Sequence, residues 1–315
     1  MAGFRQASPR QRKSPAPAEV PRSTFYYLPV SDEIRSWDLY VTGVGQESYA
    51  AGDPYPEAGH PSLYNFEWRT GRVLPEYAMI LILGGKGEFE LRNQPRTECT
   101  AGDVLLVSPG QWHRYRPSAA TGWSELWLCA GGEYLHRLRS RRLMFGHGSV
   151  ALGARFHDTR RLIAEILDFV RNHPNVNSPL LTARLLAVVA LISEAGGGET
   201  LEQAGPAAAD SHVVDAIEFI WHNSHRPIQT KDVARAVKLE PRTLERRFAA
   251  CHPRAVHEEI EESRYLRARR LLIESTLPIK EIAYSTGFGE PKRMIELFRR
   301  RDAKTPGEFR LGAAK

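Results

Sequence analysis

The stretch from Ile228 to Phe298 contains one small apolar pattern twice, and this repeat constrains the fold more than any other feature of the chain. Each copy predicts a short helix, a tight turn and a second helix whose apolar residues, spaced i and i+4, face inward. Pro241 and Pro291 fall in the first turn of the second helices, where proline is tolerated. The spacing therefore predicts two helix-turn-helix units joined by one helix, at about residues 256–275. The repeated landmarks are Val233-Ala234, Leu239, Leu244 and Phe248, which return as Ile282-Ala283, Phe288, Met294 and Phe298.

The outer faces of the two second helices are polar and mostly basic. Arg and Lys suit guanine edges and phosphates, and Glu can accept a hydrogen bond from cytosine. A single basic amphipathic helix is usually only a solvated surface, but two such units in tandem predict a DNA-binding domain. The residues expected to face a DNA major groove are Arg242, Thr243, Glu245 and Arg246 in the first unit and Lys292, Arg293 and Glu296 in the second.

This part of the chain resembles the AraC-type transcription regulators, whose DNA-binding domain has two helix-turn-helix units of this length joined by a helix. The similarity runs from His212 to Arg310 and is carried by VARAVKLEPRTLERRF, SRYLRARRLL, IKEIAYSTGF and TPGEFR. The family pattern places base-facing residues at all the positions named above except Thr243. The chain departs from the pattern at three positions: Val256 replaces a proline, and Asp302 and Ala303 replace an aromatic residue and a glycine.

The net charge of +6 lies entirely on the part predicted to bind DNA. From His212 onward there are 21 Lys and Arg against 15 Asp and Glu, whereas the preceding residues carry 22 of each. This asymmetry is typical of nucleic-acid contact. Three widely spaced cysteines predict isolated reduced thiols. The N-terminus does not have the pattern of a signal peptide. The longest apolar run, Leu185 to Ile192, is too short to span a membrane. We therefore expect a cytoplasmic protein without a membrane partner.

From Thr24 to about Glu133 the hydrophobic pattern is that of short β-strands. The run from Tyr77 to Leu83 is continuously apolar, and Gly84-Gly85-Lys86-Gly87 is expected to form a turn. The segment GDVLLVSPGQWH, from Gly102 to His113, resembles the second motif of cupin barrels, and many AraC-type regulators carry such a sensor barrel. The predicted fold class is α+β: a cupin-like β-barrel with a helical dimerisation segment, followed by an all-α double helix-turn-helix domain.

Cupin enzymes hold a metal through a histidine pair spaced i and i+2, a glutamate and a later histidine. Between Tyr64 and Leu91 there is no histidine, so His113 alone remains of that set. A catalytic metal site needs about three protein ligands. We therefore expect no metal, no cofactor and no catalytic residue, with His113 serving as a hydrogen-bonded structural residue or as a ligand contact.

The sugar-sensing members of the family have an arginine on an early strand, an aromatic residue after the histidine and a tryptophan on the last strand. In this chain the resemblance assigns those roles to Arg69, Tyr115 and Trp127. Glu125 lies two residues before Trp127 and therefore shares its face of the strand. Aromatic faces stack on sugar rings while Arg and Glu bond hydroxyls, so this set suits a sugar. The alternative is that Tyr115 and Trp127 are core residues and Arg69 lies on the surface.

Four segments follow along the chain: a disordered arm at 1–23, an effector-binding domain at 24–195, a small-residue linker at 196–211 and the DNA-binding domain at 212–315. Helical periodicity from Thr159 to Glu194 indicates helices that pack on the barrel and, in relatives, pair two subunits. The predicted function is a transcription regulator that binds operator DNA as a homodimer, responds to a small molecule such as a sugar, and contacts RNA polymerase if it activates transcription. The alternatives are an effector-independent regulator whose barrel only dimerises, and a cupin enzyme.

Overall fold

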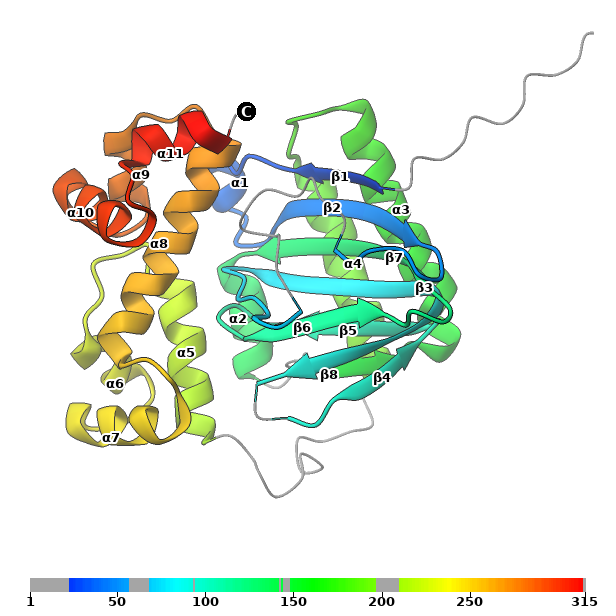
Figure 1. The fold of residues 1–315 in the computed structure, drawn as a ribbon, viewed down its shortest axis with the longest axis horizontal. Helices are drawn as coiled ribbons and strands as arrows, with labels where there is room; N and C mark the ends of the chain where they lie inside the picture. Colours follow the sequence, from blue (N-terminus) through cyan, green and yellow to red (C-terminus); the bar gives the residue numbers. More distant parts are fainter. Residues whose placement is uncertain are drawn as a thin grey trace, which may run out of the picture.

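A computed structural model describes residues 23–56, 68–92, 94–141, 143, 148–196 and 210–313. The predicted arm at 1–23 lies almost wholly outside the described residues, as does most of the linker predicted at 196–211. The N-terminal half is a β-domain and the C-terminal part is entirely helical, so the predicted fold class is confirmed. Figure 1 shows the β-domain on the right and the helical domain on the left.

The β-domain is built on a highly twisted antiparallel sheet in the order β1-β2-β7-β3-β5-β8, with β4 and β6 both paired to β3. Short helices α1 (Asp32–Arg35) and α2 (Glu133–Ser140) connect strands, and a 3-10 turn, η1 (Gly153–Arg155), follows the last strand. The strands are β1 (Ser23–Tyr27), β2 (Tyr40–Tyr49), β3 (Tyr77–Leu91), β4 (Thr97–Thr100), β5 (Asp103–Val107), β6 (His113–Pro117), β7 (Trp123–Gly131) and β8 (Gly148–Ala151).

The prediction of a turn at Gly84-Gly85-Lys86-Gly87 is wrong, because β3 continues through these residues as one long strand. Its first half pairs with β5 and β7, and its second half pairs with β4 and β6. At Gly85, where φ is +83°, a Cβ would lie 2.2 Å from the carbonyl oxygen of Gly122. The glycines therefore let the strand bend tightly against its neighbours as it passes from one sheet layer to the other.

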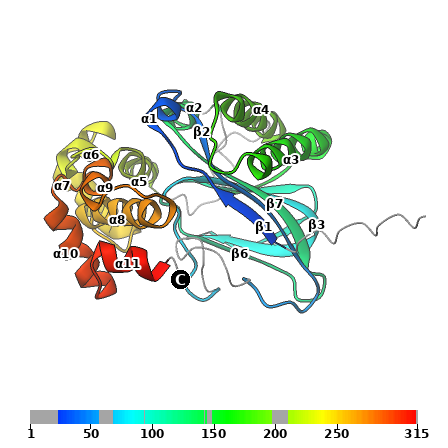
Figure 2. The same cartoon turned by 90° about the horizontal axis from the view of Figure 1, so that it is seen from above.

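Two longer helices, α3 (Phe156–Asn172) and α4 (Pro179–Gly196), cover the outer face of the sheet (Figure 2). Among the described residues, α4 is one helix whose length and hydropathy would allow it to cross a membrane. In this fold it packs on α3, β2 and β8, and its buried side chains, Leu181, Leu185, Val188 and Ile192 among them, belong to the core on that face. Here α4 is therefore a core helix of the domain.

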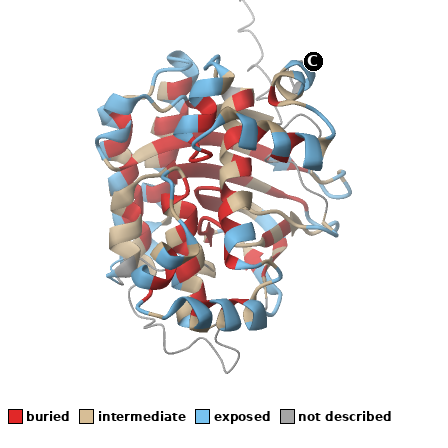
Figure 3. Ribbon diagram, turned by 90° about the vertical axis from the view of Figure 1, so that its left-hand side faces the viewer, coloured by how far each residue is buried: buried red, intermediate tan, exposed pale blue. Residues whose placement is uncertain are grey.

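The helical domain contains the two predicted helix-turn-helix units. The long helix α8 (Val256–Glu274) joins them, α5 (Ser211–Asn223) precedes them and α11 (Pro306–Ala313) follows them. The first unit is α6 (Thr230–Ala236) with α7 (Pro241–Cys251), and the second is α9 (Ile279–Ser285) with α10 (Pro291–Asp302). Viewed from this domain, the outer helix surfaces are exposed and the inner faces are buried (Figure 3).

The two domains share one continuous cluster of buried apolar residues. The cluster runs from the inside of the barrel, at Leu74 and Trp127, to Trp221 on α5 and Phe248 on α7. Helices α5 and α8 lie nearer the barrel than α7 and α10 do (Figures 1 and 2). In this arrangement the second helices of both units therefore face away from the barrel.

Charged side chains add to the contact between the domains. Glu218 on α5 is buried, accepts a hydrogen bond from Tyr77 (2.8 Å), and pairs with Arg139 (2.5 Å) and His136 (3.3 Å) on α2. On α8, Arg270 pairs with the buried carboxylate of Glu76. Because each pair joins residues far apart in sequence, these contacts fix how the helical domain docks on the barrel.

Candidate nucleic-acid interface and ligand cavity

In the first unit, α7 presents its predicted DNA-facing residues to solvent. Leu244 and Phe248 are fully buried and hold the helix against its neighbours. The opposite face carries Arg242, Glu245 and Arg246, which are exposed, with Thr243 partly buried beside them. The i, i+4 spacing of the apolar pair therefore fixes which side of the helix is free.

The second unit repeats this geometry on α10. Met294 and Phe298 are fully buried, while Lys292, Arg293 and Glu296 are exposed. Lys292 and Glu296 lie 4.0 Å apart as an i, i+4 pair on the exposed face. Both second helices thus expose two basic residues and one acidic residue, a set able to read base edges, although only Arg242 and Lys292 match in charge at the same position of the repeat.

Other arginines of these helices are held by carboxylates. Arg247 pairs with Asp210 (3.1 Å), Arg300 with Glu261, and Arg301 with Glu262. Within the part of the chain that the structure describes, no ion pair involves Arg242, Arg246 or Arg293. Arg299 on α10 is exposed and likewise has no ion pair among the described residues, so these four guanidiniums are the ones left available for DNA.

The turns of the two units share one left-handed residue at the same place in the repeat. It is Lys238 (φ +56°) in the first unit and Gly287 (φ +83°) in the second. Gly287 is also packed closely, because a Cβ there would lie 2.0 Å from the carbonyl oxygen of Ser224. The first unit begins at Thr230, the first residue of α6, and Gln229 before it donates its backbone N–H to the carboxylate of Asp232 (2.9 Å).

Two of the three positions that depart from the family pattern, Asp302 and Ala303, lie at the end of α10. Ala303 takes a left-handed conformation (φ +53°), which glycine adopts without strain. The carboxylate of Asp302 accepts a hydrogen bond from Tyr265 on α8 at 2.8 Å. Asp302 therefore ties α10 to the joining helix.

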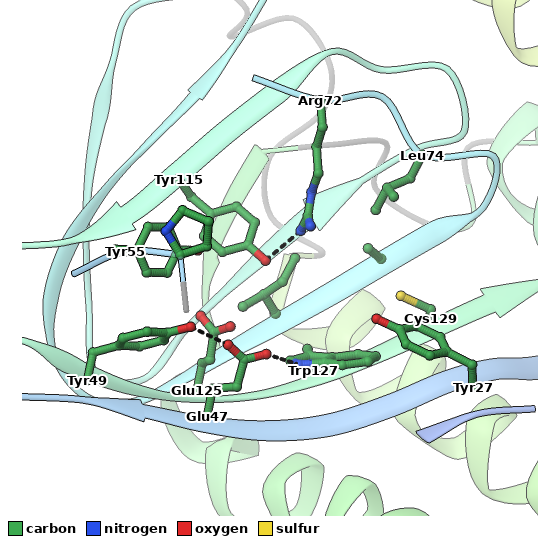
Figure 4. Close-up of a pocket in the computed structure, with 13 residues that line it drawn as sticks. Tyr27, Glu47, Tyr49, Tyr55, Arg72, Leu74, Tyr115, Glu125, Trp127 and Cys129 are labelled. Carbon is green, nitrogen blue, oxygen red and sulfur yellow. Dashed lines mark hydrogen bonds between the residues drawn. The ribbon is translucent and has the colours of Figure 1, made fainter. Parts of the chain in front are cut away.

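A cavity opens inside the barrel, with about 460 Å³ of empty space including its mouth (Figure 4). Its charged groups come from Glu47 on β2, Glu125 on β7 and Arg72. The aromatic rings that line it are Tyr27, Tyr49, Tyr55, Tyr115 and Trp127, and the remaining lining residues are Pro56, Leu74, Ala78, Ile80 and Cys129.

The structure brings Tyr115, Glu125 and Trp127 together in this cavity, but not Arg69. Residues 68–70 form a turn in which Arg69 is exposed, so the strand expected to carry Arg69 inward does not extend there. Arg72 takes that place and donates to the Tyr115 hydroxyl at 2.8 Å. An isolated β-bridge pairs the backbone of Arg72 with that of His113, and this pairing directs Arg72 rather than Arg69 into the cavity. The sequence pattern gave no sign of that pairing.

His113 lies behind Arg72 and is not among the cavity-lining residues. Its Nδ1–H donates to the carbonyl oxygen of Gln111 (3.0 Å), and its Nε2 accepts from Arg72 Nε (3.2 Å). Burial and the charge of Arg72 lower the pKa of His113 to about 3, so the ring is neutral. His113 therefore orients Arg72, which fits the structural role expected for it.

The two cavity glutamates lie directly opposite each other on neighbouring strands. Glu47 accepts hydrogen bonds from the hydroxyl of Tyr49 and from the indole N–H of Trp127 (3.0 Å). Glu125 is 1% exposed, and its Oε2 has no hydrogen-bond partner in the part of the chain that the structure describes. Across the described ranges, no group of three or more His, Cys, Asp or Glu side chains is placed to hold a metal ion.

Fold and sites together define a DNA-binding regulator with an attached ligand-binding domain, and comparison with known proteins identifies its family. A family model described as an AraC-like ligand binding domain matches residues 52–203, and a helix-turn-helix domain model matches residues 233–312. The chain belongs to the AraC-type transcription regulators, as its sequence predicted. It is therefore a DNA-binding regulator and not an enzyme.

Three relatives illustrate the similarity. The lactose operon transcription activator of Staphylococcus xylosus is 24% identical over 81% of this chain and 89% of its own length. The arabinose operon regulatory protein of Escherichia coli (strain K12) is 26% identical, over 76% of this chain and 83% of its own. The HTH-type transcriptional regulator GlxA of Rhizobium meliloti is 39% identical over 27% of this chain and 26% of its own.

Proposed function

We propose that a small molecule, specifically a sugar, binds in the barrel cavity and changes how the C-terminal domain engages operator DNA. The cavity offers stacking faces and charged hydrogen-bonding groups side by side, which is the usual way of holding a hydroxylated ring. Relatives named for lactose and arabinose operons support a ligand of this class, although their identity to this chain is low.

The observation that carries this proposal is the short segment from Arg72 to Glu76. Arg72 and Leu74 line the cavity, and Glu76, two residues further on, binds Arg270 on the helix that joins the two DNA-reading units. The Arg270 guanidinium also donates to the carbonyl oxygen of Thr42 on β2 (3.0 Å). A ligand that moves Arg72 would therefore act on the docking of α8.

A second contact converges on the same segment. The backbone N–H of Gly110 donates to the carbonyl oxygen of Leu74 (2.9 Å). Gly110 also lies so close to Trp221 on α5 that a Cβ there would come within 2.3 Å of the indole ring. Two routes thus lead from the cavity wall to the helical domain, which favours effector control over the alternative that the barrel only dimerises.

We also infer that the regulator is a homodimer paired through α4. Besides its buried face, this helix exposes Leu180 (51%) and Leu186 (40%), separated by less than two turns. Exposed leucines on a helix that is apolar almost all round are typical of a surface that pairs with another chain. Sedimentation of a Leu180→Lys/Leu186→Lys variant should give a monomer, and an unchanged dimer would rule out this face.

The proposal is tested by thermal denaturation of the full chain against a panel of sugars, aromatic acids and peptides. At about a hundred times its dissociation constant, a ligand should stabilise the wild type by about 2.7 kcal/mol. Trp127→Ala should abolish that shift and leave DNA affinity largely intact, because Trp127 lies on β7 inside the barrel, whereas the DNA-facing residues lie on α7 and α10 of the helical domain. A shift with an aromatic acid or a peptide alone would contradict the sugar assignment.

A further inference from the structure

The cavity contains more acidic than basic groups. Glu47 and Glu125 enter it from opposite positions on β2 and β7, while Arg72 is the one basic side chain among the lining residues that the structure describes. The donors around Glu47 satisfy its carboxylate, whereas Glu125 Oε2 is buried without a hydrogen-bond partner in the described residues. A buried carboxylate oxygen without a donor is costly.

The surroundings of Glu125 oppose its ionisation. Burial and the neighbouring charge of Glu47 raise the pKa of Glu125 well above 4.5, and Arg72 only partly opposes them. Arg72 meanwhile donates to Tyr115 and His113. A proton on Glu125 balances the charges of Glu47 and Arg72, and a cation on the ligand would balance an ionised Glu125 equally well.

The walls of the cavity also favour a cation. The ring centroids of Tyr49 and Tyr55 lie 4.9 Å apart at a steep angle, and those of Tyr55 and Tyr115 lie 6.2 Å apart. On the other side, the rings of Tyr27 and Trp127 are separated by 5.8 Å. Electron-rich ring faces attract an ammonium group, most strongly where water is excluded.

We propose that the effector carries a protonated amino group, as an amino sugar does, and that Glu125 binds this group between the tyrosine rings. The inference rests on the proposed function, because it takes the cavity as the effector site and narrows the class of ligand. Arg72 and Glu47 then remain to bond the hydroxyls. Charge-assisted hydrogen bonds of this kind are about twice as strong as neutral ones.

The test is calorimetric titration of the full chain, slightly below neutral pH, with matched ligands. The pairs are D-glucosamine with D-glucose and D-galactosamine with D-galactose, and N-acetyl-D-glucosamine keeps the nitrogen without its charge. The aminated member should bind about tenfold or more tightly than its neutral partners. Glu125→Gln should remove most of that preference, whereas Glu98→Gln, an exposed glutamate on β4, should leave it unchanged.

A second measurement needs no ligand. Because Glu125 is a buried acid without a donor for Oε2, Glu125→Gln should unfold at the same temperature as the wild type or higher.

Equal binding of neutral and aminated sugars, with no effect of Glu125→Gln, would overturn the inference and leave the sugar site standing. If no sugar binds but tyramine does, and Glu125→Gln abolishes its binding, the sugar assignment fails and the amine inference holds. If no aminated probe binds, the amine inference is overturned.

Discussion

Removing the Arg270 guanidinium should loosen the docking of the helical domain on the barrel. Glu76 is buried with its side chain 2% exposed, and Arg270 is 12% exposed. Arg270→Met keeps the length and apolar stem of the side chain but withdraws the charge from a buried carboxylate. Such a loss in a buried ion pair costs about 3–5 kcal/mol.

The lower end of that range applies here. Arg267, one turn earlier on α8, is half-buried and lies close enough to Glu76 for the two charges to interact. This neighbour can therefore compensate in part for the missing guanidinium. We expect Arg270→Met to lower the free energy of unfolding by about 3 kcal/mol, and Glu76→Gln/Arg270→Met to cost markedly less, because no unpaired charge remains.

The assay is urea denaturation of the full chain, followed by circular dichroism together with calorimetry to see whether the domains unfold separately. Arg235→Met is the matched control, because Arg235 is exposed and its one ion pair among the described residues is with Asp232 on its own helix. The control should change stability by less than about 0.5 kcal/mol. An Arg270→Met protein as stable as the control, or a double variant as unstable as Arg270→Met alone, would refute the reasoning.

Three further predictions concern other parts of the molecule. Arg246→Ala should cost about 1–3 kcal/mol in binding to selected DNA and relax the preference at one base pair; an equal loss on random DNA would reassign Arg246 to phosphate. Ala303→Gly should raise stability to urea by about 1 kcal/mol, because Ala303 is left-handed, and an unchanged midpoint would mean that this residue carries no strain. Burial alone would lower the pKa of His136, but the hydrogen bond and charge of Glu218 outweigh it and raise the pKa above 6.5. The stabilisation by protonated His136 is therefore complete below its pKa in the unfolded chain and is lost as pH rises through its pKa in the folded protein. Above pH 6.5 the melting temperature should fall more for the wild type than for His136→Gln, and parallel curves would contradict this.

The helix-turn-helix units were predictable because their signals are local. Pairs such as Leu244 and Phe248 fix the inward face of a helix within one turn, and that decides at once which residues are exposed. The same holds for Trp127 and Glu125, which alternate along one strand and both line the cavity. Periodicity over a few residues was sufficient in each case.

The rest of the cavity depends on pairing between distant strands. Arg72 enters it because it bridges to His113, and Glu47 enters it because β2 pairs with β7 in a register that places it opposite Glu125. Neither register is visible in a single sequence. The sequence did contain one clue to this face of β2. Gly43 and Gly45 alternate with Glu47 along the strand, and the absence of their side chains leaves room for the ring of Trp127.

The docking of the domains could not be predicted at all. The Glu76 and Arg270 pair joins residues 194 positions apart, and the Glu218 cluster joins α5 to α2 and β3. Each of these residues reads in the sequence as an ordinary charged surface position. Only the packed arrangement shows that they are buried between domains.

The most direct test of the account is the affinity for DNA with and without a cavity ligand. The DNA is a duplex that the protein itself selects from random sequences, and the ligand is whichever amino sugar or sugar gives the largest thermal shift; binding is followed by fluorescence anisotropy. Saturating ligand should change the wild-type dissociation constant about fivefold or more, and Glu76→Gln should reduce that change while leaving ligand affinity largely intact. A ligand that shifts the melting temperature yet leaves the affinity for DNA unchanged would contradict the coupling of cavity and DNA-binding domain.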